Sequence, residues 1–327
     1  MLRHTHGLQI AAIVLVLGST EAAATLQRTF VASTGADANP CSLVAPCRSF
    51  GAAITQTSPG GEVIVLDSAG YGPFVVSKSV SVTAPAGIYA GITVFSGTGI
   101  DATAGFDVSL RGLTINGQGG AYGIEFTGVG NKLIVDRCDI SNMTSAGIKI
   151  DGSTLPLVTA AISNVRIDRS FNGIQVLSYA TVTIVNSQLS YNGDGVRVQP
   201  TTWESRVSID RSTLDHNTSD GVAVGGTYAA FVTISGSELD ANFFGVNAFT
   251  ATALVYVTDS RLVGSHSYGV IQQNSSNVVL SGNLISTNGA SGVENYTAGH
   301  VYTMKNNTIR DNALYNLYQA LSPLTLD

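Results

Sequence analysis

Four aspartates in the middle of the chain stand at repeated positions where carboxylates from different segments could act together. Asp215 and Asp240 each follow the leucine of two similar phrases, STLDHN and SELDAN, whereas Asp194 and Asp220 each directly precede a glycine. If these segments stack, the four carboxylates and His216 gather on one edge. Like charges that close raise a pKa or recruit a cation, which suits acid/base catalysis or a Ca²⁺ site. The alternative is structural, because aspartate is favoured in exposed turns.

Three aromatic residues occupy the turns that follow the same segments. Tyr179, Trp203 and Tyr228 stand at corresponding places in successive repeats, and Trp203 is the only tryptophan of the chain. An aromatic face suits the apolar face of a sugar ring. The alternative is that these rings pack on one another and cover the loop QPTTWESR.

The elements that must position these residues repeat along the chain. Glycines recur every 22 to 26 residues before a short Val/Ile-rich segment, at Gly123, Gly147, Gly173, Gly195, Gly221, Gly245, Gly269 and Gly292. A fixed period in this range indicates a solenoid, and the alternating apolar pattern indicates strands rather than helices. We therefore predict an all-β solenoid of about 24 residues per coil, in which equivalent residues stack about 4.8 Å apart.

Stacking by this period assigns each repeated residue to a column. Two inward columns read Ile184, Ile209, Ile234, Val257 and Leu280, and Leu189, Leu214, Leu239, Leu262, Ile285 and Ile309. Asn192, Asn217 and Asn242 belong to a further column, whose amides would bond the backbone of the next coil. The outward column after each glycine reads Glu125, Lys149, Gln175, Arg197, Ala223, Asn247, Ile271 and Glu294. The repetition is therefore architecture, and chemistry must lie in residues that depart from it.

The phrase Leu-x-x-Asn-x-x-x-Gly-Val resembles the repeat of the right-handed parallel β-helix proteins of the pectate-lyase-like superfamily, over roughly residues 60–320. The segment TFVASTGADANPCSLVAPCRSFGAAI (29–54) is similar to the N-terminal cap of exported bacterial members. The resemblance implies a small capping segment at 25–59 and a right-handed parallel β-helix with a C-terminal cap at 60–327. It also implies substrate contacts on one outward sheet face, where Lys149 and Arg197 would meet uronate carboxylates. The alternative is a solvated face on which opposite charges such as Glu125 and Lys149 are neighbours.

The N-terminus is predicted to be an export signal. Residues 1–24 combine Arg3, an apolar run from Ile10 to Leu17 and three alanines, as in a cleaved signal peptide, with an uncleaved anchor as the alternative. No later stretch is long and apolar enough to span a bilayer. We expect a periplasmic or extracellular protein in which Cys41 and Cys47 form a disulfide. Cys138 falls in a column of small residues and is expected to be a buried thiol.

Two functions are consistent with these features. A net charge of −6 argues against nucleic acid or an anionic membrane as the main partner. The leading hypothesis is an exported β-helix that binds, and as a lyase or hydrolase would cleave, an acidic polysaccharide. Its catalytic or Ca²⁺-binding groups would be Asp194, Asp215, Asp220 and Asp240, and its substrate contacts Arg197, Tyr179, Trp203 and Tyr228. The rival is a non-catalytic surface or matrix scaffold, favoured because the sequence has no Asp-Asp pair, no Gly-His-Gly and no Arg-Ile-Lys segment typical of polygalacturonase-like enzymes.

Overall fold

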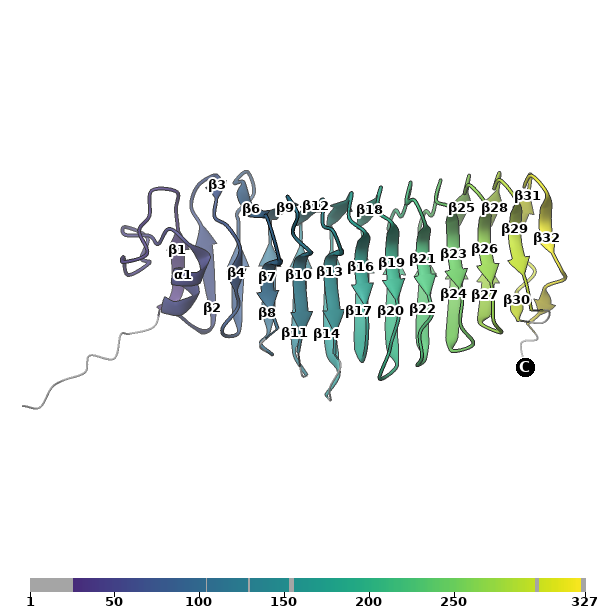
Figure 1. Ribbon diagram of the computed structural model, residues 1–327, viewed down its shortest axis with the longest axis horizontal. Coiled ribbons are helices and arrows are strands. Elements are labelled where there is room, and N and C mark those ends of the chain that lie inside the picture. The colour runs from purple at the N-terminus through teal and green to yellow at the C-terminus, as the bar shows by residue number, and fades with distance from the viewer. Residues whose placement is uncertain (1–25, 104, 129, 153–155, 298–299, 325–327) are drawn as a thin grey trace, which may run out of the picture.

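The computed structural model describes residues 26–103, 105–128, 130–152, 156–297 and 300–324. The chain winds into a rod of successive coils lying side by side (Figure 1). Strands from consecutive repeats pair in parallel, with Glu125 opposite Lys149 and Lys149 opposite Gln175. The predicted all-β solenoid of about 24 residues per coil is therefore confirmed. The predicted signal peptide at 1–24 lies outside the described residues.

Three parallel sheets run along the rod in the described part of the chain. Sheet 1 contains β1 (Leu26–Val31), β2 (Thr57–Val65), β5 (Val80–Thr83), β8 (Val108–Arg111), β11 (Lys132–Asp136), β14 (Val158–Ser163), β17 (Ala180–Val185), β20 (Ser205–Asp210), β22 (Ala230–Ser235), β24 (Ala253–Thr258), β27 (Asn277–Ser281), β30 (Val301–Thr303) and β33 (Ser322–Pro323). Sheet 2 contains β4 (Phe74–Val75), β7 (Thr98–Ala102), β10 (Tyr122–Thr127), β13 (Ala146–Asp151), β16 (Asn172–Val176), β19 (Asp194–Val198), β21 (Asp220–Val224), β23 (Phe244–Ala248), β26 (Tyr268–Gln272), β29 (Ser291–Asn295) and β32 (Tyr315–Tyr318). Sheet 3 contains β3 (Ala69–Gly70), β6 (Ala90–Val94), β9 (Leu113–Gly117), β12 (Asp139–Ser141), β15 (Arg166–Asp168) and β18 (Gln188–Ser190), and it continues through single bridges at Thr213 and Glu238 to β25 (Arg261–Val263), β28 (Leu284–Ser286) and β31 (Thr308–Arg310).

Inward columns of apolar residues fill the interior of the rod. The predicted isoleucine column is confirmed, because its members are register partners in sheet 1 and all are buried, namely Ile184, Ile209, Ile234, Val257 and Leu280. Each coil buries its apolar residues against its neighbours rather than within itself. The stability of one coil therefore depends on the coils on either side.

The recurring glycine is required by a close approach between coils. A Cβ atom added to Gly195 would lie 2.6 Å from the carbonyl oxygen of Gly221, and one added to Gly221 would lie 2.6 Å from that of Gly245. No side chain fits at such a distance. The glycine period that marks the repeat in the sequence therefore reports a close backbone contact between successive coils.

Asparagine side chains tie the coils together where the chain turns from sheet 3 into sheet 2. Asn217 Oδ1 accepts the backbone N–H of Asn192 at 3.0 Å, and Asn217 Nδ2 donates to the carbonyl of Leu189 at 3.0 Å. Asn242 repeats this pattern one coil later, with the N–H of Asn217 at 2.9 Å and the carbonyl of Leu214 at 2.8 Å. The structural interpretation of the asparagine column is confirmed, since these amides satisfy buried backbone groups, but they bond the backbone of the preceding coil rather than of the next one.

The helix α1 (Phe50–Gln56) lies at the N-terminal end of the rod, beside β1 and β2 (Figure 1). Ser49 caps the helix, because its hydroxyl accepts the backbone N–H of Ala52 at 3.3 Å. The ring of Phe50 packs against Tyr71 and Phe74, with centroids 5.3 Å and 4.8 Å apart. The division into a cap at 25–59 and a β-helix at 60–327 stays a prediction. Within the described ranges, no helix is long and apolar enough to cross a membrane.

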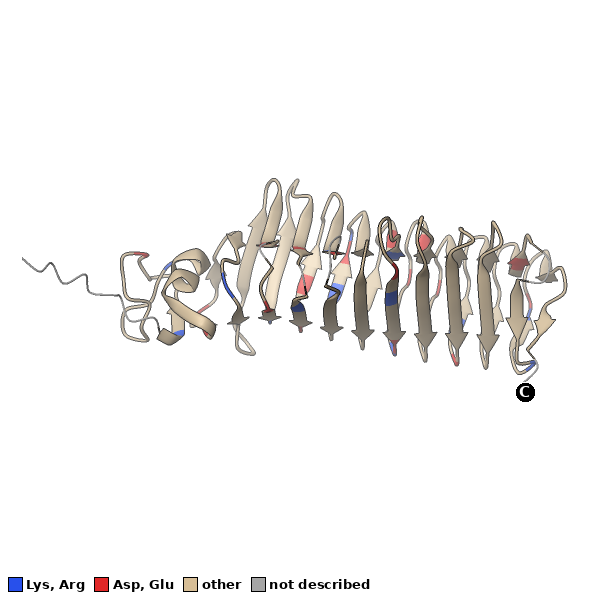
Figure 2. Ribbon diagram, turned by 90° about the horizontal axis from the view of Figure 1, so that it is seen from below, with Lys and Arg blue, Asp and Glu red and all other residues tan. Residues whose placement is uncertain are grey.

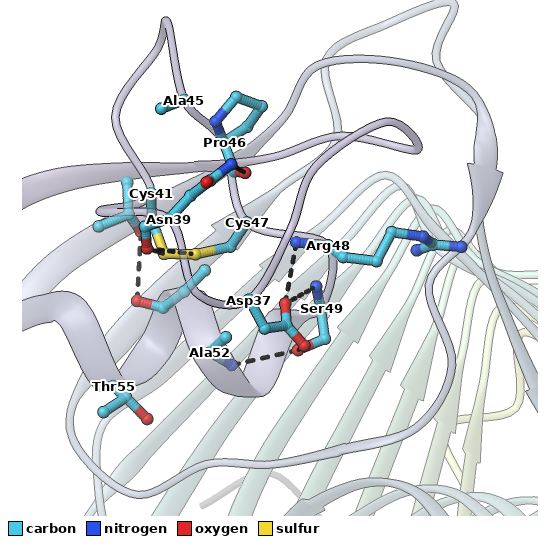
Figure 3. Close-up of a disulfide and its surroundings, with 12 residues drawn as sticks. Asp37, Asn39, Cys41, Ala45, Pro46, Cys47, Arg48, Ser49, Ala52 and Thr55 are labelled. Atoms are coloured by element: carbon cyan, nitrogen blue, oxygen red, sulfur yellow. Dashed lines mark hydrogen bonds between the residues drawn. A yellow bond between two sulfur atoms is a disulfide. The ribbon is translucent and has the colours of Figure 1, made fainter.

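A disulfide joins Cys41 to Cys47 in the loop before α1 (Figure 3). The Asn39 amide donates to the carbonyl of Pro46 across the same loop at 2.8 Å. Cys138 is a buried free thiol, and burial raises its pKa to about 12. The expected Cys41–Cys47 disulfide and the expected buried thiol of Cys138 are thus both present.

The C-terminal end of the rod leaves part of its apolar interior accessible. Leu317 in β32 pairs in register with the buried Val293, yet it is 41% exposed, and neighbouring Leu314 is 69% exposed. Up to Leu324, the described residues after β32 therefore do not bury the last inward position. Whether residues 313–327 act as the predicted cap stays a prediction.

Candidate functional site

The outer surface of sheet 2 carries the outward column predicted from the sequence. Its members are successive register partners, running Glu125, Lys149, Gln175, Arg197, Ala223, Asn247, Ile271 and Glu294. Acidic and basic segments lie on neighbouring coils in the middle of the rod (Figure 2). Because side chains alternate along a strand, this column faces away from the buried apolar columns. The column runs parallel to the rod axis, and its members Ala223, Ile271 and Glu294 are buried.

Both cations of this column are already paired with carboxylates. Lys149 Nζ lies 2.9 Å from Glu125 Oε1, which matches the alternative of neighbouring opposite charges. Arg197 Nη1 donates to Asp194 Oδ2 at 2.9 Å, and Arg197 Nε donates to Gln199 Oε1 at 3.0 Å. The Arg197 side chain is 29% exposed. A ligand carboxylate at Arg197 would therefore compete with Asp194 for the guanidinium.

Asp194 and Asp220 lie together on adjacent coils at the start of β19 and β21. Asp194 Oδ1 accepts the backbone N–H of Asp220 at 3.2 Å, while its Oδ2 faces Arg197. Asp220 Oδ2 accepts a hydrogen bond from the Asn247 amide at 3.0 Å. Within the described part of the chain, the buried Oδ1 of Asp220 has no hydrogen-bond partner. The two carboxyls are therefore neighbours, but Asp194 is paired with a cation whereas Asp220 is bonded to a neutral amide.

Burial and a like charge together raise the pKa of Asp220 to about 7. Burial is the larger cause, because the ionised carboxylate loses its water, and the negative charge of Asp194 is the second. The Asn247 amide and the Arg197 guanidinium act in the opposite direction without offsetting these causes. A cation-paired carboxyl beside one that carries a proton near neutral pH is an arrangement suited to acid/base chemistry.

Asp194 and Arg197 line a depression of about 530 Å³ in the surface of the rod. Phe171 and Tyr191 also line it, and both rings are exposed. Asp220 is only 4% exposed and does not line the depression. A ligand held there would contact Asp194 and Arg197 directly. Asp220 would not touch the ligand, but its backbone N–H is bonded to Asp194.

Asp215 and Asp240 form a second pair, which the structure places on sheet 3 rather than beside Asp194 and Asp220. Asp215 accepts a hydrogen bond from the Ser190 hydroxyl and contacts His216 Nδ1 at 3.0 Å. Asp240 lies 3.2 Å from Arg261, and burial, as the largest cause, raises its pKa.

The expectation that all four acids gather on one edge is corrected by this arrangement. The corner that contains the asparagine column separates the residue after each leucine from the residue before each glycine. Among the described residues, no three His, Cys, Asp or Glu side chains lie close enough together to hold a metal ion. The four carboxylates therefore form two pairs on two sheets.

The three aromatic residues chosen from the sequence lie in turns that leave sheet 2. The rings of Tyr179 and Trp203 pack together with centroids 5.8 Å apart, as the structural alternative expected. Trp203 and Tyr228 are nevertheless 45% and 46% exposed. None of the three lines the depression that contains Asp194. The structure therefore separates these aromatics from the Asp194–Asp220 pair.

A different aromatic group, which the sequence interpretation missed, lies on the coils that follow the acid pair. Phe244 and Tyr268 are register partners, and Phe244 is the register partner of Asp220. With Tyr296 they line a groove of about 710 Å³. Following the residue before each glycine beyond Asp220 would have found Phe244 and Tyr268.

Three solved structures share this fold with the chain at low sequence identity. The complex of XylC with xylose has a TM-score of 0.65 and 9% identity, over 86% of this chain and 75% of that one. The A-module of the Azotobacter vinelandii mannuronan C-5 epimerase AlgE4 has a TM-score of 0.54 and 15% identity, over 81% and 91%. Pectate lyase Pel9A has a TM-score of 0.50 and 16% identity, over 85% and 74%. None of the curated proteins compared with the chain matches it.

The sequence itself also matches a family model. The model, described as a right handed beta helix region, matches residues 96–260, which is just over half of the chain. The matched range includes the Asp194–Asp220 pair and most of the repeated coils. The chain therefore belongs to the right-handed β-helix family, as its repeat predicted.

Proposed function

We propose that this chain is an exported protein that binds and processes a polysaccharide along the outer surface of sheet 2. The observation that carries the proposal is the Asp194–Asp220 pair, because two unlike carboxyls meet beside a surface depression. Supporting it, solved proteins of the same fold include a pectate lyase and a mannuronan epimerase, both named for action on polysaccharides. The Cys41–Cys47 disulfide supports export, since such bonds persist in oxidising compartments.

In this proposal Asp194 is the group that exchanges a proton with the ligand, because it lines the depression. Asp220 is a positioning residue, because its backbone N–H donates to Asp194 Oδ1 at 3.2 Å. Arg197 holds a uronate carboxylate once that carboxylate displaces Asp194 from the guanidinium. Such an exchange would free Asp194 at the moment the ligand binds. An acidic polysaccharide is therefore the ligand class that we propose first.

For a lyase, the proton beside the uronate carboxylate leaves to Asp194. Its electron pair forms a carbon–carbon double bond as the glycosidic carbon–oxygen bond breaks, and Asp194 then passes the proton to the leaving oxygen. For a hydrolase, water adds across that bond instead. The two reactions differ in their products, because only the lyase product carries the double bond.

The test is a screen of the purified protein on polygalacturonate, alginate, heteropolysaccharides that contain both uronate and uncharged units, and neutral polysaccharides, with and without Ca²⁺. We expect a uronate-containing polysaccharide to be shortened, and we expect Asp194→Asn to abolish this while Asp139→Asn, at an exposed carboxyl on sheet 3, does not. Arg197→Ala should weaken binding of the uronic-acid polymer. Turnover that is equal in wild type and Asp194→Asn would refute the catalytic assignment.

A non-catalytic scaffold is the second candidate, and one observation favours it. Both acids of the pair are nearly buried, at 5% for Asp194 and 4% for Asp220, and the asparagine ladder shows how much of the repeat is devoted to rigidity. A scaffold requires neither turnover nor glycan binding. Failure of every polysaccharide in the screen to bind would favour this function.

A further inference from the structure

The aromatic groove on sheet 2 has the chemical character of a sugar-binding surface. The rings of Phe244 and Tyr268 stack with centroids 5.4 Å apart and planes at 21°, and Tyr296 lines the same groove. Tyr296 is 54% exposed, so one ring face remains open to a ligand. Gln273 and Asn274 add amide groups to the lining. Ring faces pack against the C–H face of a sugar, and amides bond its hydroxyls.

The charges around this groove disfavour an anionic ligand. Its lining residues are Phe243, Phe244, Ser267, Tyr268, Ile271, Gln273, Asn274, Tyr296 and Thr297, and none of them carries a charge. Glu294 is the register partner of Ile271 in the outward column and is only 5% exposed. A buried carboxylate beside the groove, with no lining cation to balance it, repels a uronate and tolerates an uncharged sugar.

A chain of hydrogen bonds connects the groove to the acid pair. Asp220 Oδ2 accepts from the Asn247 amide at 3.0 Å, and Asn247 Oδ1 accepts from Gln273 Nε2 at 3.1 Å. Phe244 and Tyr268 lie one and two coils beyond Asp220, which corresponds to about 5 and 10 Å along the rod. The groove and the depression at Asp194 are therefore successive parts of one surface.

We propose that the groove lined by Phe244, Tyr268 and Tyr296 is a subsite for an uncharged sugar unit of the polysaccharide bound at Asp194. This inference rests on the proposed function and narrows it. A uniform polyuronate would place a carboxylate in the groove beside Glu294. The ligand is accordingly a heteropolysaccharide, in which an uncharged unit follows the unit held at Arg197.

The inference is tested by calorimetric titration with neutral oligosaccharides, using xylo-, manno- and gluco-oligosaccharides of at least four units, and with an oligogalacturonate. We expect a neutral oligosaccharide to bind, and Tyr296→Ala to weaken its affinity by about tenfold. Tyr256→Ala is the matched control, because Tyr256 is a 41% exposed tyrosine on sheet 1, and it should change nothing. Gln273→Ala should weaken binding as well, independently of any effect on the aromatic rings.

Glu294→Gln tests the electrostatic part of the inference, because a loss of structure would weaken the binding of both ligands and a loss of charge would not. The substitution should strengthen oligogalacturonate binding while leaving neutral binding within about twofold of wild type. The inference is overturned if no neutral oligosaccharide binds at the highest soluble concentration, or if Tyr256→Ala and Tyr296→Ala behave alike. It is likewise overturned if wild type prefers the oligogalacturonate and Glu294→Gln leaves that preference unchanged.

The two proposals fail in different experiments. Neutral binding that survives in Asp194→Asn, together with an absence of turnover in wild type, would refute the catalytic proposal and support the subsite. Turnover that depends on Asp194 but is insensitive to Tyr296→Ala would support the catalytic proposal and refute the subsite.

Discussion

Replacing Asp220 with asparagine should stabilise the protein at alkaline pH and not at acidic pH. The pKa of Asp220 is raised from 3.8 to about 7, so the folded chain keeps a proton that the unfolded chain releases at lower pH. The folded state therefore loses stability as the pH rises from 3.8 to about 7. The full difference corresponds to about 4 kcal/mol above pH 7 and vanishes below pH 3.8. Asparagine removes the ionisation while its side-chain oxygen can still accept from Asn247.

The assay is urea unfolding of wild type and Asp220→Asn at pH 4 and pH 8. The free energy of unfolding of the variant, relative to wild type, should rise by about 4 kcal/mol between the two pH values. Other carboxyls titrate in both proteins and cancel in this comparison. Asp139→Asn, which removes an exposed carboxyl, should show no such rise. An equal difference between Asp220→Asn and wild type at both pH values would refute the argument that burial and Asp194 hold a proton on Asp220.

Three further predictions concern the same coils. Asp194→Asn should lower the pKa of Asp220, measured by carboxyl carbon NMR, because the charge of Asp194 is the second cause of the shift; an unchanged value would leave burial as the sole cause. Asn217→Ala should destabilise the rod by about 1–3 kcal/mol in urea unfolding, since it orphans the N–H of Asn192 and the carbonyl of Leu189, whereas Thr218→Ala at the exposed neighbour should stay within about 0.5 kcal/mol. Cys138 should react with iodoacetamide only in denaturant, because the thiol is buried and its pKa is raised to about 12; rapid labelling of the native protein would contradict this placement.

The register of the coils could be predicted from the sequence because the same spacing between equivalent residues recurs in many successive repeats. The isoleucine column, the outward column and the asparagine ladder are each defined by several equivalent positions, and the structure confirms all three. A Cβ atom on Gly195 would lie 2.6 Å from the carbonyl oxygen of Gly221, so the close approach of the coils requires glycine at this position of the repeat.

The site was harder to predict, because a repeat gives the height of a residue along the rod and not the corner at which the chain turns. Asp215 and Asp194 have equivalent partners on neighbouring coils, yet a turn places them on different sheets. Likewise Trp203 stands out by its rarity in the sequence, whereas the groove is built by the commoner residues Phe244 and Tyr268. The raised pKa of Asp220 depends mainly on its burial, which cannot be predicted from the spacing of residues in the sequence.

The asparagine ladder has a direction, and this direction affects how the rod is completed. Each asparagine oxygen receives the N–H of the preceding coil, so Asn192 relies on Asn217 and Asn217 relies on Asn242. The backbone N–H of one coil therefore stays without its acceptor until the following coil has folded. In a chain truncated within the ladder, only the last coil would lack the asparagine that accepts its N–H. The earlier coils would keep theirs.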